Sequence, residues 1–459
     1  MTPVRHVLIV GGGITGLSAA VRLAEVPDVR VTVVEQSPRL GGKLLTGSVA
    51  GRTVESGAEA FLARRPETVE LAARVGLADR VIHPAPVPAG LYVDGALREL
   101  PRGTVMGVPA DPASIAGVVT AAGLARAGAE PIGDGPLLAP GEDAAVGALV
   151  RHGFGDEVVD RLVDPLLGGV YAGRADDLSV RVAVPQLAAA AQRHRRLSDA
   201  VRDCLPPAPE PGARPAPVFG SIEGGLSQLV AAAARASGAR ILTGLPVREL
   251  SRTPQGWRAV LGATRDPQVL EADRVVLAVP ARPAARLLAP VSAAAAAEIG
   301  RLDYAGIGLV TLALPEVDLP RRSGLLVPPT EGLTVKAATF FDRKWPTTGH
   351  DGLTLVRMSI GRYPDVATLQ RDDSELVAIA HRELSGMLRM PLPEPVDTSV
   401  DRWGGALPQY GPGHLDRIRR AREALADQPI LLAGAAFDGV GIPACVASGT
   451  AAAVAAAQL

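Results

Sequence analysis

Cysteine and aromatic residues are scarce in this chain, and neither sign of charge dominates. Its two cysteines, Cys204 and Cys445, provide neither a disulfide framework nor the spacing of a metal site, so we expect no metal. Aromatic residues make up only 3% of the chain, and a net charge of −1 gives no global field that would attract nucleic acid or an anionic membrane. An anionic ligand must therefore be met by local cations.

Long apolar runs are also missing. No stretch of about 18 residues lacks a polar interruption, and the alanine-rich C-terminus is broken by Ser448, Gly449, Thr450 and Gln458. The first residues, MTPVR, lead straight into an apolar strand and leave no room for a cleavable signal peptide. We therefore expect a cytoplasmic protein with no membrane span, although peripheral contact with a membrane stays open.

The strongest motif lies in the first thirty-five residues. Residues 6–10 (HVLIV) predict a buried strand and residues 11–16 (GGGITG) a tight turn, after which apolar residues recur at helical spacing to residue 24. A second apolar run ends on Glu35, nineteen residues after Gly16. This pattern is a complete dinucleotide-binding fingerprint.

Each position of the fingerprint has a physical role. Gly11 permits the sharp turn, Gly13 lets backbone approach a pyrophosphate, and Gly16 lets the helix pack closely on the strand. The helix N-terminus faces the phosphates, and the Glu35 carboxylate can accept both ribose hydroxyls while repelling the 2′-phosphate of NADP. The alternative is a glycine-rich turn in an ordinary α/β domain.

The segments that follow distinguish FAD from NAD. Arg39-Leu40-Gly41-Gly42-Lys43 offers another close backbone approach and two cations, and residues 55–61 (ESGAEAF) come next. Simple NAD domains need neither segment. Here the chain resembles the FAD-dependent amine oxidase superfamily, and that resemblance places residues 57–60 along the flavin. Without the flanking motifs, Arg39 and Lys43 would equally suit a solvated loop.

The C-terminus has a second candidate cofactor motif. Residues 430–434 (ILLAG) predict a strand, and Gly441-Ile442-Pro443 opens an alanine-rich helix, with the proline in its first turn. If this helix points its N-terminus at a flavin, its amides stabilise negative charge on the ring. A plain strand–helix terminus is the alternative.

The order of elements predicts an α/β protein of two or three domains. We expect a discontinuous Rossmann-like FAD-binding domain (1–62, 218–290 and 425–459), a mixed α+β substrate-binding domain (63–100 and 291–424) and an inserted helical domain (101–217). Asp94-Gly95 predicts a hairpin turn, and the proline-rich stretch 206–217 predicts a linker or exposed loop.

Several stretches resemble one family more closely, the soluble bacterial protoporphyrinogen and coproporphyrinogen oxidases. They are residues 56–64 (SGAEAFLAR), 164–173 (DPLLGGVYAG), 177–187, 336–346 (KAATFFDRKWP) and 403–410 (WGGALPQY). With the two cofactor motifs, the resemblance implies noncovalent FAD at Gly11, Gly12, Gly13, Ile14, Thr15, Gly16, Glu35, Gln36, Arg39, Gly42, Lys43, Gly57, Ala58, Glu59, Ala60, Val247, Trp403, Gly434, Gly441, Ile442 and Pro443.

The resemblance also implies a reaction, the six-electron oxidation of a porphyrinogen to a porphyrin, in which three O2 become three H2O2. Coproporphyrinogen III is the preferred substrate because the likeness is to the Gram-positive type, and protoporphyrinogen IX is the alternative. Another flavin amine oxidase or desaturase, or a non-enzymatic escort protein of the same fold, remains open. So do transient contact with the next haem-pathway enzyme and the oligomeric state.

The substrate pocket is less well defined by the sequence. Gly169 and Tyr171 could line a macrocycle, or could be a loop turn and a core tyrosine. Arg65, Arg98 and Lys336 could bind propionates through charge-assisted hydrogen bonds, or could be solvated surface cations. No catalytic acid or base is assigned, because the flavin carries the redox chemistry.

Overall fold

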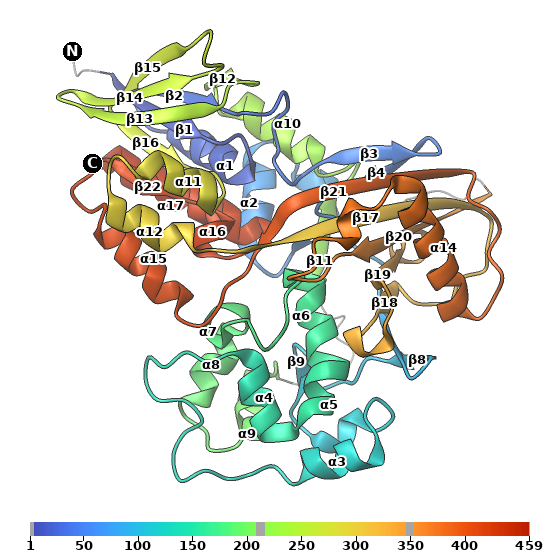
Figure 1. Ribbon diagram of the computed structural model, residues 1–459. Helices are drawn as coiled ribbons and strands as arrows, with labels where there is room; N and C mark the ends of the chain where they lie inside the picture. The colour runs from blue at the N-terminus through green and yellow to red at the C-terminus, as the bar shows by residue number, and fades with distance from the viewer. Residues whose placement is uncertain (1–3, 208–215, 346–351, 459) are drawn as a thin grey trace.

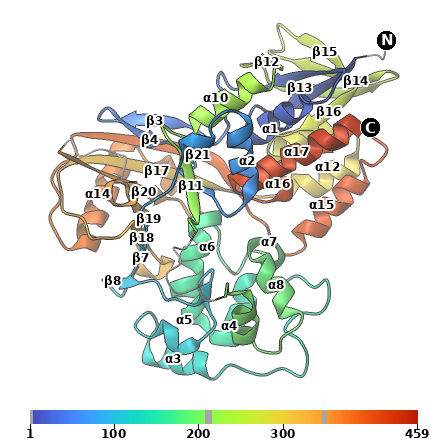
Figure 2. The same ribbon diagram turned by 180° about the vertical axis from the view of Figure 1, so that it is seen from behind.

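The computed structural model describes residues 4–207, 216–345 and 352–458 (Figure 1). Most of the predicted proline-rich linker, and Pro346 of one family motif, lie outside the described residues. The chain folds as an α/β protein, as expected, with a nucleotide-type sheet, a large mixed sheet and a group of helices (Figures 1 and 2).

A parallel five-stranded sheet carries the N-terminal motif. Its order is β12-β2-β1-β16-β22, and its strands are β1 (Arg5–Val10), β2 (Val29–Val34), β12 (Arg240–Leu242), β16 (Arg274–Leu277) and β22 (Ile430–Leu432). Val7 on β1 pairs with Val31 on one side and with Arg274 on the other. Segments more than 150 residues apart in sequence are thus joined in one sheet.

Both faces of this sheet are buried, which accounts for its continuous apolar runs. Helices α1 (Ile14–Leu23) and α17 (Ile442–Gln458) cover one face, where Ile9 contacts a cluster that includes Ala19 and Ala453. The other face packs against a three-stranded antiparallel sheet of β13 (Val247–Thr253), β14 (Gly256–Leu261) and β15 (Gln268–Ala272), with Trp257 fully buried. The two chain ends therefore share one layer.

A seven-stranded sheet forms the second part of the molecule. Its order is β21-β17-β20-β19-β18-β7-β8, and its strands are β7 (Gly90–Val93), β8 (Ala96–Glu99), β17 (Tyr304–Pro315), β18 (Gly324–Leu326), β19 (Val335–Phe340), β20 (Leu353–Ile360) and β21 (Asp397–Pro408). Helix α14 (Asp373–Leu388) packs on one face through Leu376, Ala380 and Leu384. The predicted hairpin at Asp94-Gly95 is confirmed, since both residues have positive φ, 52° and 66°.

Residues 121–204 are mostly helical. The helices are α3 (Ala121–Gly128), α4 (Val146–Phe154), α5 (Asp156–Val158), α6 (Asp164–Tyr171), α7 (Val180–Ala183), α8 (Pro185–Ala191) and α9 (Leu197–Cys204). A π-helical turn, Val159–Val163, runs directly into α6, and such turns are frequent at functional sites. The short hairpin of β9 (Thr104–Val105) and β10 (Val108–Pro109) was not expected within the predicted helical domain.

The remaining elements connect these parts. They are β3 (Thr46–Val49), β4 (Arg52–Glu55), β5 (Phe61–Leu62), α2 (Pro66–Arg74), β6 (Val81–Ile82), β11 (Phe219–Ile222), α10 (Ser227–Ala236), α11 (Ala281–Leu288), α12 (Ala293–Gly300), α13 (Phe341–Lys344), α15 (His414–Glu423) and α16 (Ala435–Asp438), with short 3₁₀ turns at Ala78–Arg80, Pro112–Ile115, Pro329–Glu331 and Thr368–Gln370.

One predicted domain boundary differs from the packing. We expected residues from 63 onward to join the substrate sheet, but Leu71 and Ala72 of α2 lie in the same buried cluster as Leu17 of α1 and Val446 of α17. The α2 helix is amphipathic, and its apolar face is buried against the nucleotide end. The other proposed boundaries stay predictions.

Candidate functional site

The glycine turn between β1 and α1 closes too tightly for side chains at two positions. Gly11 has φ of +110°, and a Cβ there would lie 2.3 Å from the Ala278 carbonyl oxygen on the neighbouring chain segment. A Cβ on Gly16 would lie 2.0 Å from the Gly11 carbonyl oxygen. These glycines let strand, turn and helix approach one another, as the fingerprint requires.

A bare cradle lies in front of the α1 N-terminus. Gly41 N–H donates to the Gly12 carbonyl oxygen at 2.8 Å, which brings the two glycine-rich segments together. A Cβ on Gly13 would meet only the Gly42 Cα, at 3.9 Å, and no side chain caps the first amides of the helix. Uncapped amides beside open backbone fit a pyrophosphate, because they donate to its oxygens and the helix dipole favours negative charge.

Glu35 lies at the carboxyl end of β2, beside this cradle. Its Oε2 accepts from Gly12 N–H at 2.8 Å and its Oε1 accepts from Ser37 N–H at 2.8 Å. The carboxylate is half-buried, whereas the adjacent Gln36 is exposed. Glu35 is therefore held in one orientation with acceptor capacity left for ribose hydroxyls.

The segment leading into β13 runs beside Glu35. Leu245 N–H donates to the Glu35 carbonyl oxygen at 3.0 Å, and Gly244 N–H donates to that of Ser37 at 2.8 Å. Val247, two residues farther on, is buried at the start of β13. The structure thus brings the start of β13, with Val247, near Glu35.

The cations of the second glycine motif face aromatic rings. The Arg39 guanidinium lies 5.6 Å from the centre of the Trp403 ring, and the Lys43 Nζ lies 5.8 Å from that of Tyr304. Burial lowers the pKa of Lys43, and within the described residues Lys43 forms no ion pair. A partly buried ammonium without a carboxylate partner among the described residues fits an anionic cofactor.

Trp403 ties β21 to the segment that the family resemblance places along the flavin. Its Nε1 donates to the Ser56 carbonyl oxygen at 2.6 Å, and Ala58 N–H donates to the Lys43 carbonyl oxygen at 3.1 Å. A Cβ on Gly57 would lie 2.2 Å from that same Lys43 oxygen. Gly57 therefore has to be a glycine for the segments at 43 and 57 to meet, and Ala60 continues the same segment at intermediate burial.

The Glu59 side chain has partners within the protein that the sequence did not indicate. Its carboxylate pairs with Arg357 and, at 2.7 Å, with Lys344, and it accepts from Trp345 Nε1 at 2.8 Å. Burial alone would raise the pKa of Glu59, but Lys344 and Arg357 bring it down to about 2. The side chain thus anchors this segment to β20 and α13, which sequence reasoning missed because the partners are almost 300 residues away.

The C-terminal motif lies against the N-terminal one. A Cβ on Gly449 of α17 would be 2.1 Å from the Thr15 carbonyl oxygen, so the two helices cross in backbone contact. Gly434 and Gly441 have φ of +114° and +105°, and Ile442 and Pro443 are buried in the first turn of α17. Cys445 follows in that turn, where burial raises the pKa of its thiol.

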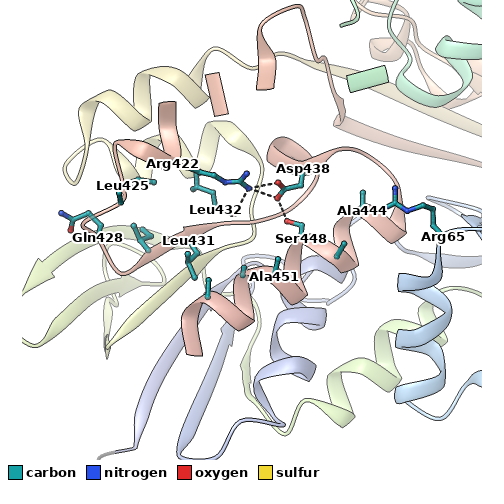
Figure 3. A pocket seen from close by; sticks show the side chains of 15 residues that line it. Arg65, Arg422, Leu425, Gln428, Leu431, Leu432, Asp438, Ala444, Ser448 and Ala451 are labelled. Atoms are coloured by element: carbon teal, nitrogen blue, oxygen red, sulfur yellow. Dashed lines mark hydrogen bonds and ion pairs between the residues drawn. The ribbon is translucent and has the colours of Figure 1, made fainter. Parts of the chain in front are cut away.

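A surface pocket of about 560 Å³ lies on the outer side of α17 (Figure 3). Asp438 accepts from Arg422 at 2.7 and 3.0 Å and from Ser448 Oγ at 2.6 Å, and that hydroxyl accepts from Gly434 N–H at 2.7 Å. This network fixes the turn at Gly434. The hydrogen bonds along this pocket therefore stabilise the C-terminal glycine motif.

The geometry supports a dinucleotide cofactor, and the comparisons with known proteins identify the family. The chain matches the model of flavin containing amine oxidoreductases over residues 14–457. It belongs to this family. It is therefore an oxidoreductase with FAD as its cofactor.

Relatives of this flavoprotein cover nearly the whole chain. It is 40% identical over 451 residues to a coproporphyrinogen III oxidase of Mycobacterium leprae, covering 97% of this chain and 96% of the relative. A Bacillus subtilis protein of the same name is 31% identical over 465 residues, with 98% and 97% covered. A crystal structure described as a protoporphyrinogen oxidase from Exiguobacterium has a TM-score of 0.86 at 29% identity, covering 99% of both chains.

The five substrate candidates fall into two groups. Arg98 is exposed on the edge strand β8, and Arg65 pairs with Glu67 at 2.5 Å with about half of its side chain exposed. Both are thus partly or fully exposed cations, and Arg65 lies at one end of the surface pocket beside α17 (Figure 3). Gly169 and Lys336 instead lie where α6 packs against β18 and β19, and Tyr171 ends the same helix beside Tyr410 and Ala183.

Tyr171 is a buried residue at the C-terminal end of α6. Its ring contacts Tyr410 edge-to-face at 6.0 Å between ring centres, and burial raises the pKa of its phenol to about 12. Gly169 is exposed, and a Cβ there would meet only Leu326, at 3.6 Å. Open backbone thus lies next to a buried aromatic pair. No group of three or more metal-ligating side chains is found within residues 4–207, 216–345 and 352–458.

Proposed function

We propose that this flavoprotein oxidises coproporphyrinogen III to coproporphyrin III, with O2 as electron acceptor, in haem biosynthesis. The observation that carries the proposal is the near-full-length likeness to relatives named for this activity. The same likeness leaves protoporphyrinogen IX as the second candidate, because the Exiguobacterium structure is described by that substrate.

The cofactor would be held by both ends of the chain. We assign the pyrophosphate to the cradle of Gly11, Gly12, Gly13 and Gly42 with the α1 amides, and the ribose to Glu35. The flavin end would lie among Lys43, residues 57–60, Trp403 and the α17 N-terminus, whose amides favour negative charge. The orphan ammonium of Lys43 and the uncapped helix α1 support this assignment.

The chemistry that FAD supplies when bound is acceptance of hydride from the bridging methylene groups and transfer of the electrons to O2, which leaves as H2O2. Three such rounds, each removing two electrons, produce the porphyrin and three H2O2. The chain's own residues bind and orient. Glu35 and the glycine turns fix the nucleotide, and the α6–β19 junction presents open backbone to a flat macrocycle.

The cellular setting is part of the proposal. No helix within residues 4–207, 216–345 and 352–458 has the length and hydropathy to cross a bilayer. We place the protein in the cytoplasm, with peripheral membrane contact and transient contact with the next haem-pathway enzyme as further proposals. The oligomeric state is left to measurement.

A rate comparison tests the substrate. The purified protein is given coproporphyrinogen III or protoporphyrinogen IX under air, and porphyrin fluorescence and H2O2 are followed together. We expect faster turnover of coproporphyrinogen III with three H2O2 for each porphyrin. Faster protoporphyrinogen IX turnover would replace the substrate by the alternative, and a colourless protein that takes up no flavin would end the enzymatic account.

A further inference from the structure

Lys336 is a buried lysine that forms no ion pair with a carboxylate of the described residues. Its side chain is almost fully buried, and its Nζ has one hydrogen-bond partner in the described structure, the Gly168 carbonyl oxygen at a long 3.4 Å. Neither Lys336 nor its neighbour Arg362 forms an ion pair within the described residues. Leaving an ammonium buried without an anion is costly, so such a group is suited to an anionic ligand.

A β-bulge directs this side chain. The pairing of β19 with β20 slips by one residue between Val335 and Ala337, so Lys336 is the extra residue. Val335, Ala338 and Phe340 pack in the cluster that includes α14, whereas Lys336 reaches α6. Bulges commonly re-aim a side chain beside an active site, and here the result is a cation at the junction that holds Gly168 and Gly169.

The charged groups around Lys336 are held by backbone groups rather than by one another. The Arg362 guanidinium donates to four backbone carbonyls, those of Leu333, Thr334, Val327 and Val335. On α6, Asp164 accepts from Ala175 N–H at 2.6 Å, and on α14, Glu383 accepts from the amides of Thr334 and Val335. The nearby acids are therefore bound to backbone donors, and Lys336 has none.

The same junction has room on its outer side. A Cβ on Gly168 would meet only the Gly173 carbonyl oxygen, at 3.7 Å, and Gly169 is exposed. A ligand carboxylate can approach bare backbone more closely than it could approach side chains.

We propose, resting on the function above, that the Lys336 ammonium binds a propionate of the porphyrinogen at the α6–β19 junction and thereby contributes to substrate choice. Coproporphyrinogen III carries a propionate on every pyrrole ring, so each orientation of the macrocycle brings one to this lysine. Protoporphyrinogen IX carries vinyl groups on two rings, and an orientation that presents these leaves the ammonium unpaired.

The pH dependence follows with a defined sign. Burial, with a smaller contribution from Arg362, lowers the pKa of Lys336 to about 7 in the free protein. A bound carboxylate stabilises the ammonium, so affinity for a propionate is full below pH 7 and declines as pH rises through and above that value. An arginine at the same position stays charged and removes the dependence.

Binding of the oxidised porphyrin tests the inference without turnover. Coproporphyrin III and its tetramethyl ester are titrated into the flavin-loaded wild type, Lys336→Met and Lys336→Arg, and quenching of fluorescence is read at about pH 6 and pH 9. At the lower pH we expect Lys336→Met to weaken the binding of coproporphyrin III roughly tenfold or more. The affinity for the ester should stay within about twofold of the wild-type value. Lys336→Arg should retain affinity at both pH values.

A matched surface substitution, Arg235→Met, should change the affinity for neither ligand, since Arg235 is exposed on α10. Unchanged coproporphyrin III binding in Lys336→Met would overturn the inference. So would equal weakening of both ligands, because a lysine that merely tethers α6 would affect the ester as well. If the wild type instead oxidises only protoporphyrinogen IX while the Lys336 effect persists, the proposed substrate fails and the propionate site stands.

Discussion

At the level of single residues, two buried glutamates, Glu55 and Glu59, have pKa values that are set by burial and by the groups they contact. Glu59 is held by two cations and an indole, whereas Glu55, four residues earlier, accepts from Leu226 N–H and Thr46 Oγ1. Burial raises the pKa of Glu55 to about 7 despite these donors. The pKa values of two neighbouring glutamates on one segment are thus shifted in opposite directions.

Glu59→Gln should lower the free energy of unfolding and make it depend less on pH in the acidic range. The folded pKa of Glu59 is about 2, below that of the unfolded chain, so its contribution is present above about pH 4.5 and is lost as pH falls toward 2. Removing the charge leaves Arg357 and Lys344 buried and unpaired, at a cost of about 3–5 kcal/mol. Urea unfolding at several pH values measures both effects. A loss that is the same at pH 7 and at about pH 3 would contradict the assignment.

Glu35→Ala should weaken FAD by about tenfold or more, because the ribose acceptor and the partner of Gly12 N–H disappear together. Equilibrium titration of the apoprotein, followed by flavin fluorescence, gives the dissociation constant. Glu249→Gln, an exposed glutamate on β13, is the matched control and should bind as the wild type does. Equal affinities in all three proteins would exclude Glu35 as the ribose ligand.

At the level of elements, the crossing of α1 and α17 joins the two ends of the cofactor site. The contact is made by backbone: the carbonyl of Thr15 lies where a side chain of Gly449 would stand. Because α17 begins at Ile442, displacing it also moves the turn at Gly441 and Pro443.

Gly449→Ala should therefore lower both stability and flavin affinity, with a loss of about 2 kcal/mol or more from overpacking at a backbone contact. Gly386→Ala on α14 is the control, since a Cβ there meets nothing within 4 Å, and it should be neutral or stabilising by up to about 1 kcal/mol. Thermal unfolding measures the stability of both variants, and FAD titration measures their flavin affinity. A Gly449 variant with wild-type flavin affinity would show that the crossing does not position the α17 N-terminus.

For the whole molecule, the proposed cofactor site combines segments that are far apart in sequence. Residues 11–16, 35, 43, 57–60 and 441–443 come from both ends of the chain and converge on one region. A ligand held by all of them stabilises only the folded state, so its binding energy adds to the free energy of unfolding.

Removing FAD should lower the melting temperature by several degrees, since a ligand present at a hundred times its dissociation constant contributes about 2.7 kcal/mol. Hydrogen exchange should rise together at residues 11–16, 41–43 and 441–445, with α3 and α4 unchanged. Adding FAD back is the control for irreversible damage. Faster exchange confined to the N-terminal turn would mean that α17 takes no part in binding.

The amino-acid sequence by itself determined the nucleotide fingerprint, the hairpin at Asp94-Gly95 and the helix α17 with Pro443 in its first turn. These features depend on local backbone conformation, where glycine and proline leave few alternatives within a short segment. The resemblance to a known family added the predictions of FAD and of a porphyrinogen substrate, because each of its motifs is a contiguous stretch of sequence.

Only the tertiary structure decided which charges meet. The pairing of Glu59 with Arg357, the packing of α2 on α17 and the bulge that turns Lys336 toward α6 each need segments that are distant in sequence. Arg65, Arg98 and Lys336 look alike in the sequence, yet burial separates them, because the environment of a cation is set by the surfaces that fold around it.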